Sequence, residues 1–103
     1  MAKRKLIWSQ NAKIKLFEIL DYFNVRNKSN NYSKKLYHKI TKGLSILIKH
    51  PESGNKTDFG SIRGLIIESY ILFYEYTDEF IIIHTIWDAR QDPDNVASSI
   101  GKR

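Results

Sequence analysis

Apolar side chains recur at every third or fourth position in two stretches of the N-terminal half. The first stretch is Gln10 to Val25, with Ala12, Leu16, Ile19, Leu20 and Phe23. The second is Tyr32 to Ile48, with Leu36, Ile40, Leu44, Leu47 and Ile48. This spacing puts the apolar side chains on one face of a helix. Two helices are predicted, with Ser9 as the N-cap of the first and the polar segment Arg26–Asn31 as the break between them.

The C-terminal half instead carries short apolar runs of the strand type. Ile62–Ile67, Tyr70–Thr77 and Phe80–Trp87 are three such runs in succession. Asp78-Glu79 leaves only two residues between the last two runs, so those strands must form an antiparallel hairpin. The last run is almost wholly apolar and is expected to lie inside the sheet, buried on both faces. Lys5–Trp8 is a further short apolar run, predicted to be an N-terminal strand.

Together these elements predict an α+β fold with the order β-α-α-β-β-β. An antiparallel two-helix hairpin would pack on a mainly antiparallel sheet. The domain is expected to span residues 1–95, with 96–103 as a tail that is either loose or becomes ordered on a partner. Pro51–Gly60 is predicted to be a loop by composition. Gly43, inside the second helix, is expected to mark a close approach between the two helices.

Charge divides the chain into two unlike parts. The net charge is +6, and residues 1–56 hold thirteen Lys and Arg against three acidic residues. Beyond Lys56, only Arg63 and Arg90 are basic before the terminal Lys102 and Arg103, against eight acids. The excess of basic residues favours nucleic acid or an acidic protein as partner. The lysines of the second helix form either a solvated face or a surface for that acidic partner.

Several classes of protein are disfavoured. There is no cysteine, which argues against disulfides and thiolate metal sites. The three histidines are not spaced as metal ligands, and no nucleotide or calcium motif is present, so neither a metal nor a cofactor is expected. No apolar run approaches a membrane span, and the first residues do not resemble a secretory signal. A cytoplasmic protein that does not contact membranes is therefore expected.

Four residues are candidates for chemistry. Arg63 and Arg90 border apolar strands, where a guanidinium could hold a phosphate or carboxylate, or form a structural ion pair with Glu68 or Asp88. His84 could be a general acid or base on an open sheet face, or a core histidine bonded to a neighbour. Tyr70 lies in a stripe with Tyr74 and Tyr76. That stripe could stack bases, or could be a packing ladder between strands.

The order and spacing of several segments resemble the RelE/ParE superfamily of toxins from bacterial type II toxin–antitoxin systems. The segments are IWSQNA (7–12), KLYHKI (35–40), KHPESG (49–54), IRGL (62–65), YILFYEY (70–76) and IWDARQDP (86–93). They span roughly residues 5–93. One departure is that the family's basic residue within the tyrosine-rich strand is replaced here by Ile71.

The resemblance implies a growth-inhibiting toxin that is neutralised by a cognate antitoxin. The toxin would contact operator DNA only through that antitoxin. ParE-like members inhibit DNA gyrase by binding, and the scarcity of cations on the predicted sheet favours this function. RelE-like members cleave mRNA on the ribosome, and here Arg90, Arg63, His84 and Tyr70 would form a metal-independent endoribonuclease site. An inactive relative that only binds a partner is a third alternative. Whether the protein is an enzyme is left open by the sequence.

Overall fold

The computed structural model describes residues 3–90 and has a five-stranded sheet with two long helices. The chain begins with strand β1 (Lys5–Trp8), followed by helices α1 (Gln10–Asn27) and α2 (Asn31–Lys49). A 3-10 turn, η1 (Pro51–Ser53), and a short strand, β2 (Asn55–Lys56), come next. Strands β3 (Arg63–Ile67), β4 (Tyr70–Tyr76) and β5 (Phe80–Asp88) complete it. The predicted α+β class and element order are confirmed. The predicted end of the domain at residue 95 and the predicted tail, 96–103, lie outside the described residues.

The strand order in the sheet is β1-β5-β4-β3-β2. Only β1 and β5 pair in parallel, and the other neighbours are antiparallel. The pairing of β4 with β5 shifts between Phe73, opposite Thr85, and Tyr74, opposite Ile83. His84 is therefore an extra residue in the ladder, a β-bulge that re-aims the side chains around it.

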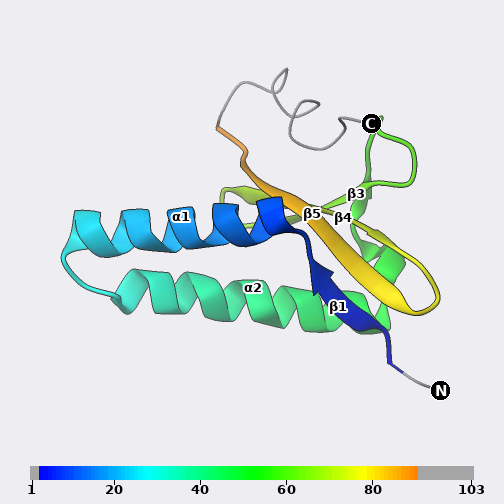
Figure 1. Ribbon diagram of the computed structural model, residues 1–103, viewed down its shortest axis with the longest axis horizontal. Coiled ribbons are helices and arrows are strands. Elements are labelled where there is room, and N and C mark those ends of the chain that lie inside the picture. Colours follow the sequence, from blue (N-terminus) through cyan, green and yellow to red (C-terminus); the bar gives the residue numbers. More distant parts are fainter. Residues whose placement is uncertain (1–2, 91–103) are drawn as a thin grey trace.

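The helix hairpin covers one face of the sheet, and the turn between the helices lies farthest from the strands (Figure 1). The main core lies between these layers. Its centre is formed by Leu36, Ile40 and Leu47 of α2 with Leu72 and Ile83 of the sheet, each at most 1% exposed. Burying an aliphatic side chain of this size contributes about 1.5–3 kcal/mol, so this layer holds the two halves of the chain together.

A smaller apolar cluster lies apart from the main core. It consists of Ile62, Phe73 and Trp87, with Phe59 and Ile71 packed against it. Ile82 and His84, which alternate with the buried Ile81 and Ile83, are only partly buried. The position of β5 inside the sheet agrees with prediction, but the expected burial on both faces holds only for its C-terminal half.

Two local expectations were wrong. Gly43 does not mark a close approach of the helices, because a Cβ there would lie 2.9 Å from Ile67 Cδ1 and 3.3 Å from Leu65 Cδ2, both on β3. The segment expected to be loop contains η1 and β2, and β2 pairs with the start of β3. A two-residue strand has too little pattern to be recognised in sequence.

Candidate functional site

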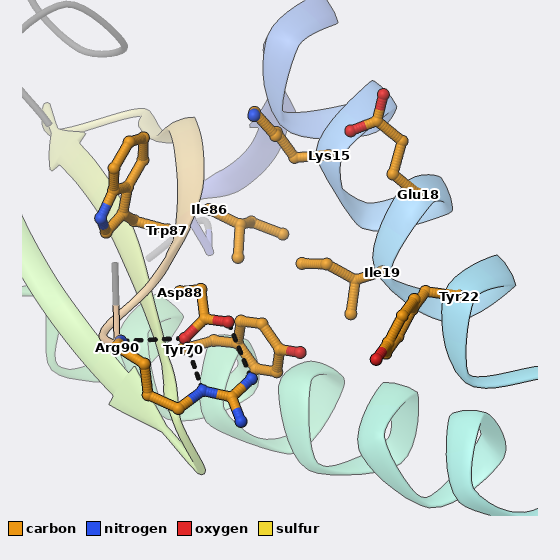
Figure 2. Close-up of a pocket in the computed structure, with 9 residues that line it drawn as sticks. All are labelled: Lys15, Glu18, Ile19, Tyr22, Tyr70, Ile86, Trp87, Asp88 and Arg90. Carbon is orange, nitrogen blue, oxygen red and sulfur yellow. Dashed lines mark hydrogen bonds and ion pairs between the residues drawn. The ribbon is translucent and has the colours of Figure 1, made fainter. Parts of the chain in front are cut away.

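A cleft of about 290 Å³ opens where α1 passes the end of the sheet. Its lining mixes both signs of charge with aromatic rings: Lys15, Glu18, Ile19, Tyr22, Tyr70, Ile86, Trp87, Asp88 and Arg90. Figure 2 shows the α1 residues on one side, with Tyr70, Asp88 and Arg90 opposite them. The cleft forms here because β5 ends at Asp88 while α1 continues to Asn27.

Arg90 is held at this cleft by its own neighbour. Its Nε donates to Asp88 Oδ1 at 2.9 Å and its Nη2 to Asp88 Oδ2 at 2.8 Å, in a bidentate pair. The Arg90 backbone N–H also donates to Asp88 Oδ1, at 2.9 Å. The hydrogen bonds from Arg90 lower the pKa of Asp88, and the same pair raises the pKa of Arg90. The arginine side chain nevertheless remains 68% exposed, so it is oriented and still accessible.

Tyr70 forms the floor of the same cleft. Tyr70 is 5% exposed, and its side chain packs in the main core. Burial raises the pKa of the Tyr70 hydroxyl, and the nearby Asp88 carboxylate adds to the effect. The phenol is therefore a neutral donor rather than a base at neutral pH.

Buried Tyr70 and Tyr74 give an expected pH dependence. Burial raises the pKa of both hydroxyls, so above about pH 10 the unfolded chain loses these protons before the folded one. The free energy of unfolding should be unaffected by these groups below that pH and should fall as the pH rises through the folded-state pKa. Urea unfolding across this range measures it. A Tyr74→Phe variant with an equally steep decline would contradict a contribution from Tyr74.

Arg63 lies elsewhere, at the junction of β3 with η1. Its Nη1 donates to the carbonyl oxygens of Glu52, at 3.0 Å, and Gly54, at 2.8 Å. Neither of the acidic partners considered from sequence, Glu68 or Asp88, is its partner in the described structure. The Arg63 guanidinium thus links the turn after α2 to the sheet, and this role is structural.

His84 occupies a third place, at the bulge of β5. Its Nε2 lies 2.7 Å from Glu75 Oε1, and Ser61 Oγ donates to Glu75 Oε2 at 3.0 Å. The imidazole and the carboxylate are about 27% and 32% exposed. A partly buried histidine beside a carboxylate is a pair suited to proton transfer, and is also an ordinary polar bridge between strands.

Only Arg90 and Tyr70 of the four candidates are brought together. Arg63 and His84 each have separate neighbours. Glu75 carries no signal in the sequence, because its position beside His84 follows from the β4–β5 register and not from spacing along the chain. Within residues 3–90, no group of histidine and acidic side chains is arranged to hold a metal ion. No helix in that range is both long and apolar enough to cross a membrane.

The comparisons with known proteins identify a toxin of the RelE/ParE superfamily. Residues 6–93 match the model of the ParE toxin of the type II toxin–antitoxin system parDE. The chain belongs to this family, whose toxins pair with a cognate antitoxin. A search of curated protein sequences found no match.

Similar solved structures support the fold. A chain of the chromosomal ParDE system from P. aeruginosa superposes with a TM-score of 0.72 at 18% identity, covering 85% of this chain and 98% of that one. An arginine-to-alanine double mutant of E. coli toxin RelE in the free state superposes with a TM-score of 0.67 at 16% sequence identity. The match covers 99% of this chain and 98% of that one. A chain of the E. coli DinJ–YafQ toxin–antitoxin complex superposes with a TM-score of 0.54 at 11% sequence identity. The match covers 84% of this chain and 93% of that one.

Proposed function

We propose that this toxin arrests growth inside the cell by binding and inhibiting DNA gyrase, and that its cognate antitoxin relieves the inhibition. The observation that carries the proposal is the match to the ParE family along residues 6–93. ParE-like toxins are the gyrase inhibitors of the superfamily. Arg90, oriented by Asp88 and accessible at the cleft, is the residue proposed to contact the target.

The separation of the candidate residues supports inhibition by binding. Cleavage of RNA needs a proton-transfer group and a cation close to the same phosphate. In the described part of the chain, His84 has Glu75 as its partner, Arg63 binds backbone carbonyls, and Arg90 lies in the cleft beside α1. A surface that only has to hold a protein partner needs no such convergence.

Purified toxin should inhibit DNA supercoiling by gyrase, and Arg90→Ala should raise the concentration for half-inhibition about 10- to 100-fold. A lost charge-assisted hydrogen bond costs about 1.5–3 kcal/mol, which corresponds to that range. Arg4→Ala is the matched control. Arg4 is also an arginine at the surface, but its Nε donates to the Thr77 carbonyl, at the opposite end of β5. Equal inhibition by the Arg90 variant and the parent would remove Arg90 from the contact.

A second candidate function is a ribosome-dependent, metal-independent endoribonuclease, favoured by the Glu75–His84 pair at 2.7 Å. Mapping mRNA ends after induction distinguishes the two. Cuts within translated codons that disappear in His84→Ala, with no inhibition of gyrase, would support the nuclease. Normal growth, with neither cuts nor inhibition, would support an inactive relative.

A further inference from the structure

The side of α2 that faces away from the core carries a row of three lysines. Lys35, Lys42 and Lys49 follow one another at intervals of seven residues, and all three are exposed. Seven residues are only about 20° short of two full turns, so the three side chains leave the helix on nearly the same side. The buried residues of α2 occupy the opposite side and are Ser33, Leu36, Ile40, Leu44 and Leu47. The three lysines therefore form a lysine row that faces solvent.

The charge of this row is not neutralised by the surrounding side chains. Helix α2 contains five lysines and no acidic residue. Within residues 3–90, Lys39 is the one lysine of α2 in an ion pair, with Glu68 at 2.6 Å. Lys34 lies to one side and lines a groove between the two helices, together with Phe17 and Tyr37. The lysine row thus presents three uncompensated positive charges in a line, which attract an anionic partner.

The make-up of the row favours a phosphate backbone over a protein as that partner. Protein interfaces are centred on buried aromatic or aliphatic anchors, and lysine is depleted from them. The row consists of lysines alone, and its exposed aliphatic neighbour is Ile46. Lysine binds phosphate as a point charge on a flexible stem, without the geometry that a guanidinium requires.

The length of the row suits a duplex. Lys35 and Lys49 are 14 positions apart, which at 1.5 Å per residue gives a row of about 21 Å. One strand of a duplex presents a phosphate about every 3.4 Å along the helix axis, so the row spans about six phosphates. Each ammonium group can therefore reach a different phosphate of the same backbone.

We propose that the lysine row binds the phosphate backbone of duplex DNA, namely the DNA that gyrase holds. The inference rests on the proposed function for the choice of DNA, but the contact itself can be measured without gyrase. The Arg90 cleft is lined by residues of α1, β4, β5 and the segment after β5, and by none of α2. The DNA contact and the contact through Arg90 should therefore be separable by mutation.

Titration of the full-length toxin into a short fluorescein-labelled DNA duplex tests the contact. If three phosphates are neutralised, the logarithm of the binding constant should fall with the logarithm of salt concentration with a slope of about −3. The triple variant Lys35→Gln, Lys42→Gln, Lys49→Gln should bind about 10-fold more weakly or worse at about 50 mM salt, and its slope should approach zero. Glutamine is a good helix former, so α2 should be retained in this variant.

The matched control removes the same amount of charge from other elements. The triple variant Lys5→Gln, Lys13→Gln, Lys56→Gln takes one exposed lysine each from β1, α1 and β2. It should bind the duplex within about twofold of the parent, because it leaves the phosphate contacts in place. Equal weakening by the two triple variants would overturn the proposal by assigning the binding to net charge. A parent toxin that leaves the duplex unbound at this salt concentration would overturn it as well.

Three further measurements identify the partner. An RNA duplex of the same sequence that binds about 10-fold more tightly than the DNA would contradict the proposal. Weaker antitoxin binding by the lysine-row variant, with DNA binding unchanged, would assign the row to an acidic protein instead. In the supercoiling assay, the lysine-row variant should need about 10-fold more toxin for half-inhibition, and inhibition equal to that of the parent would show that the row does not touch the DNA on gyrase. Failure of the parent toxin to inhibit gyrase, with duplex binding intact, would refute the proposed target and leave the DNA contact supported.

Discussion

Replacing Gly54 by alanine should lower the free energy of unfolding by about 2–4 kcal/mol, within the range of severe overpacking or of lost buried hydrogen bonds. A Cβ at this position would lie 2.4 Å from the Tyr74 hydroxyl oxygen and 2.7 Å from its Cε1. Tyr74 is fully buried and cannot move aside. Its hydroxyl donates to the Pro51 carbonyl at 2.6 Å and accepts from the Gly54 N–H at 2.9 Å. Urea unfolding measures the loss.

The backbone of Gly54 separates this steric effect from conformational strain. Its φ of −73° and ψ of 160° suit any residue, so alanine has no intrinsic penalty here. Combining Gly54→Ala with Tyr74→Phe should cost less than the sum of the single changes, because both disrupt the same pair of hydrogen bonds. Full additivity would show that Tyr74 is not the group against which the alanine collides.

Ser9→Ala is expected to be the second large change, lowering the free energy of unfolding by about 2 kcal/mol. The Ser9 hydroxyl accepts from the Ala12 N–H at 3.0 Å, which caps α1, and donates to the His84 carbonyl at 2.7 Å. The second bond satisfies a backbone oxygen at the bulge of β5. Loss of the serine removes the cap and leaves that oxygen without its partner. Thermal or urea unfolding of the purified variant gives the value.

Ser45→Ala is the control for this prediction. Ser45 is exposed within α2, and its hydroxyl donates only to the Thr41 carbonyl one turn earlier. Alanine is the better helix former, so this change should be neutral or slightly stabilising. A Ser9 variant as stable as the Ser45 variant would mean that neither hydrogen bond of Ser9 contributes measurably.

The helices and long strands could be read from sequence because each carries its own periodicity. The start of α1 was predicted correctly from Ser9, and its cap hydrogen bond is present. The short strand β2 and the bulge at His84 could not be predicted, since both depend on the partner strand. Gly43 was assigned the wrong neighbour for the same reason. A glycine signals close approach but not which element approaches.

The candidate site was predictable only in its residue types. The sequence singles out Arg63 and Arg90 as guanidinium groups at the borders of apolar strands. It singles out His84 as a polar residue inside such a strand and Tyr70 as part of a tyrosine stripe. Their positions differ because strand register and chain turns place each beside a different neighbour: Asp88 for Arg90, carbonyls for Arg63 and Glu75 for His84. The pair of Arg90 with Asp88 is local, two residues apart, and was one of the alternatives predicted from the sequence. The contacts of Arg63 and His84 form between elements, and spacing along the chain carries no information about those.

By itself, then, the sequence determined the class of fold, the order of its elements and the basic character of the helices, since periodicity and charge are local properties. The tertiary structure alone decided which groups each arginine side chain binds and where the surface is hollowed into clefts. It put Arg90 with Tyr70 in one cleft and Arg63 on the turn after α2. It also left Phe17 and Tyr37 exposed along one groove. These outcomes follow from the packing of the helix hairpin on the sheet, which no single segment encodes.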